Sequence, residues 1–163
     1  VSSGFSFFAD AAVFPFLIYG VGIESHADEG RGLTVDGFAA AVHAPVHLVL
    51  HGDKCGHFVC VIPGNCEVDL KKAAKVAGAK KAEMIPMKEL LPLTGYIRGG
   101  CTSIGMKRQF PTFFHTTALD FETIYVSAGQ RGLQLKIAPK ALIDYVKASV
   151  VDLTINPTPN QDE

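Results

Sequence analysis

The sequence lacks any apolar run long enough to cross a lipid bilayer. A transmembrane helix needs about 18–20 consecutive apolar residues, and the longest run here, residues 11–19, is interrupted by Pro15. That run also lacks the basic segment that opens a secretion signal. The sequence therefore predicts a soluble, cytoplasmic protein with no membrane partner.

Cysteine is scarce as well. The chain has no C-x-x-C pair and only four cysteines: Cys55, Cys60, Cys66 and Cys101. A single domain of 163 residues, 48% of them apolar, can bury a core without disulfides, so we expect free thiols. His51, Cys55 and His57 lie close together, but their spacing is not typical of a zinc site and no second pair of ligands matches it. The sequence predicts no metal site.

Two common glycine motifs for nucleotides are absent from the glycine-rich segment 95–110. It carries three glycines within seven residues, but neither G-x-x-x-x-G-K-[ST] nor G-x-G-x-x-G. A second turn of small residues spans positions 127–132. Because glycine backbone can approach a ligand closely, we expect a ligand pocket beside these turns and no cofactor.

The net charge is close to zero, which excludes a uniformly basic protein that coats nucleic acid. Fifteen Lys and Arg oppose sixteen Asp and Glu, but residues 54–110 alone have a net charge of +6. A basic middle third suits a partner that carries phosphate. A solvated helix face explains Lys71, Lys72 and Lys75 equally well, so charge alone leaves both interpretations open.

Helix and strand signals alternate irregularly along the chain. We expect helices at residues 35–43, 70–77, 87–91 and 139–146, and strands at 16–21, 46–50, 57–62, 123–126 and 132–137. Asp69 is the expected N-cap of the second helix, and Pro92 should end the third or lie just beyond its end. Few intervals suit a β–α–β crossover. The pattern predicts an α+β fold with a mixed, largely antiparallel, barrel-like sheet flanked by helices.

Several motifs then carry a resemblance to a known family: residues 68–81, 93–100, 104–105, 120–129 and 131–133. In this order they resemble the YbaK/EbsC family of free-standing aminoacyl-tRNA editing proteins, which are related to the editing domain of bacterial prolyl-tRNA synthetases. The resemblance covers roughly residues 46–150, and the first 45 residues match it only in outline. It implies one editing-type domain over residues 1–154 and a C-terminal tail over 155–163.

The resemblance implies that the protein deacylates Cys-tRNA(Pro) or a related misacylated tRNA. In YbaK-type members the thiol of the substrate attacks the ester, while the protein positions the substrate and stabilises the oxyanion. The implied partners are the aminoacylated 3′-end of tRNA and, as a docking platform, prolyl-tRNA synthetase. The alternatives are a catalytically impaired protein that binds the tRNA acceptor end and a small-molecule binding module on the same scaffold.

The resemblance also places the substrate contacts, and it assigns no catalytic side chain. Gly99 and Gly100 are expected to contact the carbonyl and the ribose, with Ser127, Ala128 and Gly129 as the opposing wall. Cys101 lies in the same glycine-rich segment, and we count it among the substrate-binding positions as well. A nucleophilic role for its thiol would need a lowered pKa, for which Arg98 and Lys107 are nearby, but no His–Asp partner is evident. His115, after a short strand, is expected on the surface or in a turn.

The chain departs from the family pattern at two places. Where the family has a Lys-Thr pair at the start of a strand, this sequence has Val46 and His47, which we count among the substrate-binding positions. The family loop Gly-Gly-x-Ser-Pro-x-Gly here reads Gly-Gly-Cys-Thr-Ser-Ile-Gly. Three explanations are open: an inactive or re-purposed relative, substitution of the lysine by His43 or His47 as a pH-dependent donor, or an incorrect sequence in the first third.

Overall fold

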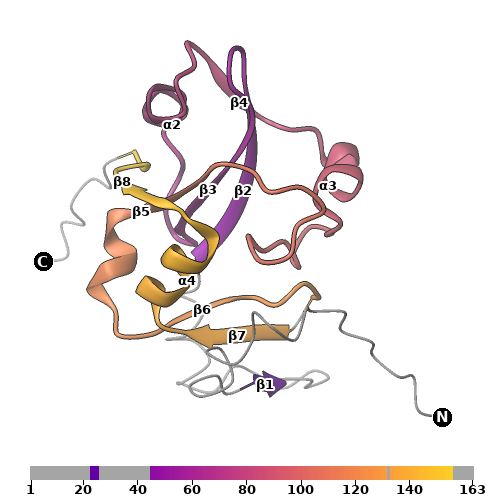
Figure 1. Cartoon of the computed structure of the whole chain (residues 1–163), viewed down its shortest axis with the longest axis vertical. Coiled ribbons are helices and arrows are strands. Elements are labelled where there is room, and N and C mark those ends of the chain that lie inside the picture. Colours follow the sequence, from indigo (N-terminus) through magenta and orange to yellow (C-terminus); the bar gives the residue numbers. More distant parts are fainter. Residues whose placement is uncertain (1–22, 26–44, 132, 156–163) are drawn as a thin grey trace, which may run out of the picture.

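The computed structural model describes residues 23–25, 45–131 and 133–155 (Figure 1). The strand expected at residues 16–21 and the helix expected at 35–43 lie outside these ranges, as does most of the expected tail. The structure does not test the predicted domain boundary, which stays a prediction. None of the described helices combines the length and the apolar character that a membrane span requires.

A five-stranded sheet forms the centre of the molecule, in the order β4-β2-β3-β5-β8. Its strands are β2 (Pro45–Gly52), β3 (Gly56–Pro63), β4 (Ala82–Met84), β5 (Thr112–His115) and β8 (Ser149–Val151). Strand β2 pairs antiparallel with both β3 and β4. Strand β5 runs parallel to β3 and to β8, so this sheet is mixed.

A second sheet has three antiparallel strands in the order β1-β7-β6: β1 (Ile23–Ser25), β7 (Leu133–Ile137) and β6 (Ile124–Ser127). Figure 1 shows it below the larger sheet. Four of the six pairings between the described strands are antiparallel, which confirms the predicted α+β class with a mixed, largely antiparallel sheet. The described strands form two open sheets rather than a closed barrel.

The three α-helices that the structure describes begin and end at residues with clear local reasons. Helix α2 (Leu70–Val76) starts where the Asp69 carboxylate accepts hydrogen bonds from the first free backbone N–H groups, as predicted. Helix α3 (Met87–Thr94) runs past Pro92 and ends at Gly95, which adopts a left-handed conformation with φ of 85°. Helix α4 (Pro139–Val146) opens with proline at its first turn.

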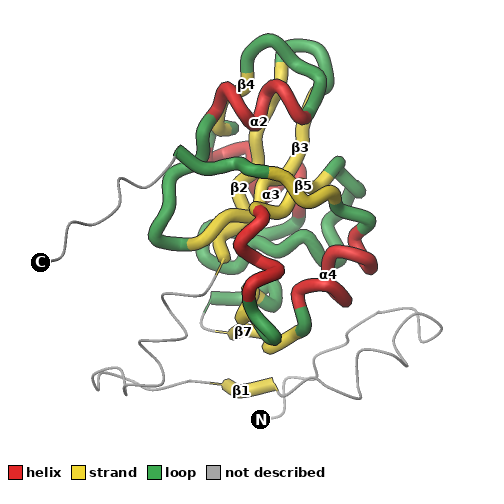
Figure 2. The backbone as a smooth tube through the Cα atoms, turned by 90° about the vertical axis from the view of Figure 1, so that its left-hand side faces the viewer, coloured by secondary structure: helices red, strands yellow, loops and turns green. Residues whose placement is uncertain are grey.

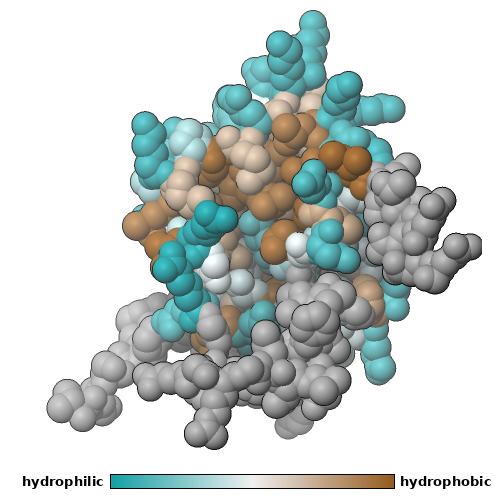
Figure 3. Space-filling model, turned by 180° about the vertical axis from the view of Figure 1, so that it is seen from behind, coloured by the Kyte–Doolittle hydropathy of each residue, from teal (hydrophilic) through white to brown (hydrophobic). Residues whose placement is uncertain are grey.

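Two apolar clusters lie on opposite faces of the larger sheet, because side chains alternate along each strand. The first contains Val49, Val61 and Phe114 and packs against α4 and the smaller sheet. The second contains Leu50 and Ile62 and packs against α2. Figure 2 shows α2 beside the upper part of the large sheet and α4 between that sheet and β7. Figure 3 shows the opposite side of the molecule from Figure 1, where an apolar region is exposed and polar side chains lie above it.

Candidate functional site

The segment between α3 and β5 is a compact loop built on backbone contacts, which we name the glycine loop (residues 96–106). The Tyr96 hydroxyl donates to the Ile104 carbonyl and closes the loop. Inside it, the Gly100 N–H donates to the Ile97 carbonyl at 3.0 Å. Gly99 has φ of +87°, a conformation that disfavours a side chain. The backbone conformation alone therefore explains the glycine at position 99, whether or not this residue contacts a ligand.

The glycine loop lies directly against the turn that follows β6. A Cβ atom on Gly100 would lie 3.1 Å from the Gly129 carbonyl oxygen and 3.2 Å from Gln130 Cα. The Arg131 guanidinium Nε donates to the Arg98 carbonyl at 2.9 Å and ties the two segments together. The two predicted turns are thus neighbours, but at Gly100 they touch and leave no room for a ligand between them. The binding roles of Gly99, Gly100, Ser127, Ala128 and Gly129 stay predictions.

Val46 and His47 point to opposite faces of the larger sheet. His47 pairs with Val61 and lies on the face of the sheet that the glycine loop covers. Its ring is edge-on to the ring of Phe114, with 6.4 Å between the two ring centroids. Val46 pairs with Ile62, a member of the cluster on the other face, and is 39% exposed. Of the two substituted positions, only His47 faces the glycine loop.

The His47 ring makes a polar contact with Ser103 and packs beside apolar side chains such as Phe114. Its Nε2 is 3.1 Å from the Ser103 hydroxyl oxygen. Its Nδ1 is buried, and no group among the described residues hydrogen-bonds to it. Burial lowers the pKa of His47 to about 4, because the charged imidazolium would lose hydration. His47 is therefore a neutral hydrogen-bonding group near neutral pH, not a replacement for the charge of a lysine.

Cys101 is buried in the glycine loop, at 8% exposure. Burial raises the pKa of its thiol to about 11, and a weaker contribution from Thr94 opposes that shift. The nearby Arg98 and Lys107 do not reverse this direction. Since the thiolate is the reactive form of cysteine, the alternative that Cys101 is a nucleophile is not supported.

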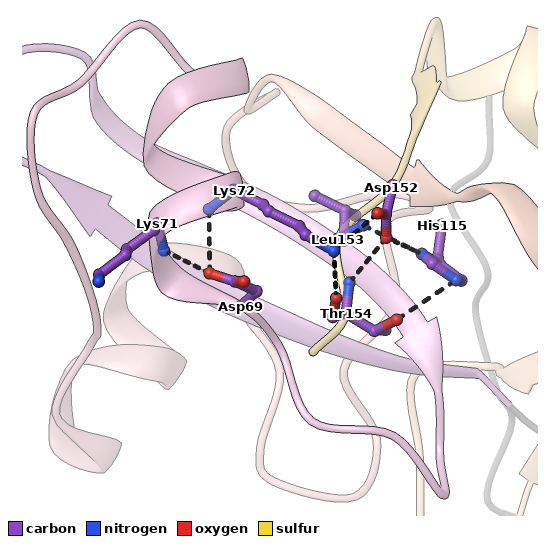
Figure 4. A network of polar contacts seen from close by, with 7 residues as sticks. All are labelled: Asp69, Lys71, Lys72, His115, Asp152, Leu153 and Thr154. Carbon is purple, nitrogen blue, oxygen red and sulfur yellow. Dashed lines mark hydrogen bonds and ion pairs between the residues drawn. The ribbon is translucent and has the colours of Figure 1, made fainter. Parts of the chain in front are cut away.

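His115 lies in a polar network away from the glycine loop (Figure 4). Its expected surface placement is wrong: the residue is 7% exposed and its Nδ1 accepts the Leu153 N–H at 3.0 Å. The Lys72 ammonium donates to Asp152 and to the Thr154 carbonyl, each at 2.7 Å, and so joins α2 to the segment after β8. Burial lowers the pKa of His115, against the opposing charge of Asp152. These contacts give the network a structural role.

Two cavities are candidates for a ligand. The first, of about 340 Å³, lies between the end of the glycine loop and the C-terminal end of α4; Ser103, Arg108, Phe110, Tyr145 and Lys147 are among its lining residues. Its volume is in the range of small-molecule sites. The second, of about 230 Å³, is mostly apolar and lies beside the 3₁₀ helix η1 (Thr116–Asp120).

None of the eight binding positions predicted from the sequence lines either cavity. Ser103, which does line the first, was missed, although its replacement of a family proline was visible in the loop motif. No group of three His, Cys, Asp or Glu side chains in the described ranges is arranged to hold a metal ion.

Comparison with known proteins now decides the family. The model of the family described as "Aminoacyl-tRNA editing domain" matches residues 40–145. The chain belongs to this family. This confirms the relationship that the sequence motifs indicated.

The curated relatives match only part of their own length. A protein of Enterococcus faecalis named "Putative Cys-tRNA(Pro)/Cys-tRNA(Cys) deacylase EbsC" is 50% identical over 107 residues, which cover 66% of this chain and 65% of that protein. Another, "Uncharacterized protein YwhH" of Bacillus subtilis, is 27% identical over 85 residues, or 52% of this chain and 54% of YwhH. The chain thus spans less than two thirds of the length of these relatives.

A solved structure described as "a putative trans-editing enzyme for prolyl tRNA synthetase" shares the fold. Its TM-score is 0.70 at 22% identity, with 83% of this chain and 87% of that chain covered. At this level of identity the likeness supports the architecture of the two sheets and the helices, and it does not place the substrate.

Proposed function

We propose that this protein edits aminoacyl-tRNA by cleaving the ester of a misacylated tRNA, with Cys-tRNA(Pro) as the first substrate to test. The observation that carries the proposal is the family match over residues 40–145. The 50% identity to a relative named for Cys-tRNA(Pro) and Cys-tRNA(Cys) points to the substrate. The protein would act in the cytoplasm, and prolyl-tRNA synthetase is the candidate docking platform.

The site geometry supports ester cleavage at the first cavity. Arg108 and Lys147 bring two positive side chains to its lining, next to Ser103 at the end of the glycine loop. Positive groups suit both a terminal phosphate and an oxyanion that develops on the ester carbonyl. In the reaction expected for a cysteinyl substrate, the thiol of the substrate attacks the ester carbonyl and the C–O bond to the ribose breaks. Cysteine leaves as a thiolactone, and the proton of the thiol ends on the ribose oxygen, which becomes a free hydroxyl. The chain then has to position and stabilise rather than supply a nucleophile.

The test is a deacylation assay with Cys-tRNA(Pro), Ala-tRNA(Pro) and correctly charged Pro-tRNA(Pro). We expect the protein to accelerate loss of cysteine or alanine and to leave the prolyl ester at its uncatalysed rate. If all three esters decay at the uncatalysed rate over the pH range in which the protein is folded, the proposal is refuted.

A second candidate is a protein that binds the tRNA acceptor end without catalysis. Val46 favours it, because the position of the family lysine holds an apolar side chain on the face away from the glycine loop. Binding of uncharged tRNA at several salt concentrations separates the two candidates from a small-molecule binder. Each phosphate contact contributes about −0.7 to the slope of log K against log salt for a single strand. Arg108→Ala should therefore flatten the slope by about that amount, and Lys140→Ala, at an exposed position outside the cavity lining, is its matched control.

A further inference from the structure

The two departures from the family pattern meet in space. His47 replaces the family threonine on β2, and Ser103 replaces the family proline in the glycine loop. The positions are 56 residues apart, yet the imidazole Nε2 lies 3.1 Å from the serine Oγ. A proline at position 103 has no hydroxyl group with which to make this contact. The pair is therefore a property of this chain that the family motif does not contain.

The contact has the geometry of a nucleophile and its base. A serine hydroxyl becomes nucleophilic when an imidazole within about 2.6–3.2 Å accepts its proton. Burial keeps the His47 ring neutral near pH 7 and makes it a weaker base than a free imidazole, and its Nε2 lone pair accepts a proton in the tautomer that carries the ring proton on Nδ1. Packing against Phe114 fixes the ring, which limits the loss of alignment between the two groups.

Ser103 also lies where a substrate can reach it. It lines the cavity of about 340 Å³ and is half-buried, whereas the His47 Nδ1 is fully buried. Arg108 and Lys147 line the same cavity, so an oxyanion formed at Ser103 would develop near two positive side chains. The nucleophile and the positive charge thus line one cavity, and the base contacts the nucleophile from outside that lining.

We propose that Ser103 and His47 form a serine–histidine pair that cleaves carboxylic esters through an acyl-Ser103 intermediate, which extends editing to amino acids without a thiol. The substrate class rests on the proposed function, since the ester would be that of a misacylated tRNA. A side chain such as that of alanine has no thiol to attack its own ester, and in this proposal Ser103, rather than water, makes the first attack.

The step balances without a cofactor. Ser103 Oγ attacks the ester carbonyl carbon while His47 Nε2 takes the hydroxyl proton, and a tetrahedral intermediate forms. The bond from the carbonyl carbon to the ribose oxygen breaks, and His47 returns the proton to that oxygen. Water then attacks the acyl-serine, gives its proton to His47 and releases the free amino acid, and the proton returns to Ser103 Oγ.

The experiment compares the wild-type protein, Ser103→Ala and Ser149→Ala, the last changing an exposed serine of β8 as a matched control. Hydrolysis of Ala-tRNA(Pro) should fall by about 100-fold or more in Ser103→Ala, while the thiol-assisted reaction on Cys-tRNA(Pro) should fall far less. Independently, a fluorophosphonate probe and p-nitrophenyl acetate should label Ser103 covalently in the wild type and in Ser149→Ala, but not in Ser103→Ala. Mass analysis of the labelled peptide locates the group.

Each outcome separates this inference from the proposed function. If both aminoacyl-tRNAs are cleaved equally by the wild type and Ser103→Ala, and no probe labels Ser103, the pair is refuted and editing stands. If the wild type cleaves neither aminoacyl-tRNA yet Ser103 is labelled, the pair stands and the editing proposal fails. His47→Gln tests the base through loss of labelling, and Ser103→Ala carries the test alone if His47→Gln does not fold.

Discussion

Acid should destabilise the folded protein through His47. The pKa of this residue is lowered by burial from 6.5 to about 4, so the unfolded chain binds a proton in a pH range where the folded protein does not. The stabilisation is therefore complete above about pH 6.5 and is lost as the pH falls toward 4. His115, whose pKa is also lowered mainly by burial, adds to the loss in the same direction.

The magnitude follows from the two pKa values. With 6.5 in the unfolded chain and about 4 in the folded protein, His47 lowers the free energy of unfolding by about 2 kcal/mol between pH 7 and pH 5. The limit well below pH 4 is about 3 kcal/mol. A loss of this size is a large part of the total stability of a small domain.

Urea denaturation of the wild type and His47→Gln at pH 7, 6 and 5 measures the effect. Glutamine has a similar length, can hydrogen-bond to Ser103 and does not titrate. Its own cost is independent of pH, so the difference between the two proteins should shrink by about 2 kcal/mol from pH 7 to pH 5. His51→Gln, the same substitution at an exposed position of the same strand, is the matched control. Parallel pH profiles for the wild type and His47→Gln would refute the burial argument.

Three further predictions concern the local structure. Asp69→Ala should lower the free energy of unfolding by about 1 kcal/mol because α2 loses its N-cap, whereas Asp69→Asn should cost less; urea denaturation measures both. Gly100→Ala should cost about 1–3 kcal/mol in the same assay, since its Cβ would meet the Gly129 carbonyl oxygen at 3.1 Å, and wild-type stability would show that the two turns do not touch. Iodoacetamide at pH 8 should leave Cys60 and Cys101 unmodified in the folded protein. Burial raises the pKa of these thiols to about 12 and about 11, so neither is present as the reactive thiolate. The mass of the Cys101 peptide measures the reaction, and rapid alkylation would contradict the burial of this residue.

Elements with local signals were predictable and those that depend on pairing were not. Helix α2 carries its own cap at Asp69, and its start was correctly predicted. Strands β4 and β8 have three residues each, too few for a periodic pattern, and exist because β2 and β5 offer free edges. Helix α3 continues past Pro92 to Thr94, and there the threonine hydroxyl donates to the Leu90 carbonyl, a side-chain contact that the rule about proline does not include.

The site shows the same division. The two glycine turns were visible as motifs, and their contact at Gly100 was not. His115 was placed on the surface because its partner, the Leu153 N–H, lies 38 residues further along the chain. The contact between His47 and Ser103 spans 56 residues, so no reading of either motif alone could have joined them.

The family lysine that Val46 replaces would have two separate properties. A lysine at the family position would supply positive charge and N–H donors. In this structure Arg108 and Lys147 bring positive charge to the cavity that Ser103 lines, from the segment after the glycine loop and from the end of α4, while the hydrogen-bonding group is His47. Neutral His47 contributes no charge near pH 7, so it can replace the lysine as a hydrogen-bonding group but not as a cation. His43 lies outside the described residues. If editing is retained, the two properties have therefore moved to different residues. Ser103→Ala should impair cleavage of the alanyl ester without lowering tRNA affinity, whereas Arg108→Ala should lower tRNA affinity and also slow cleavage, because Arg108 lines the cavity in which the oxyanion develops.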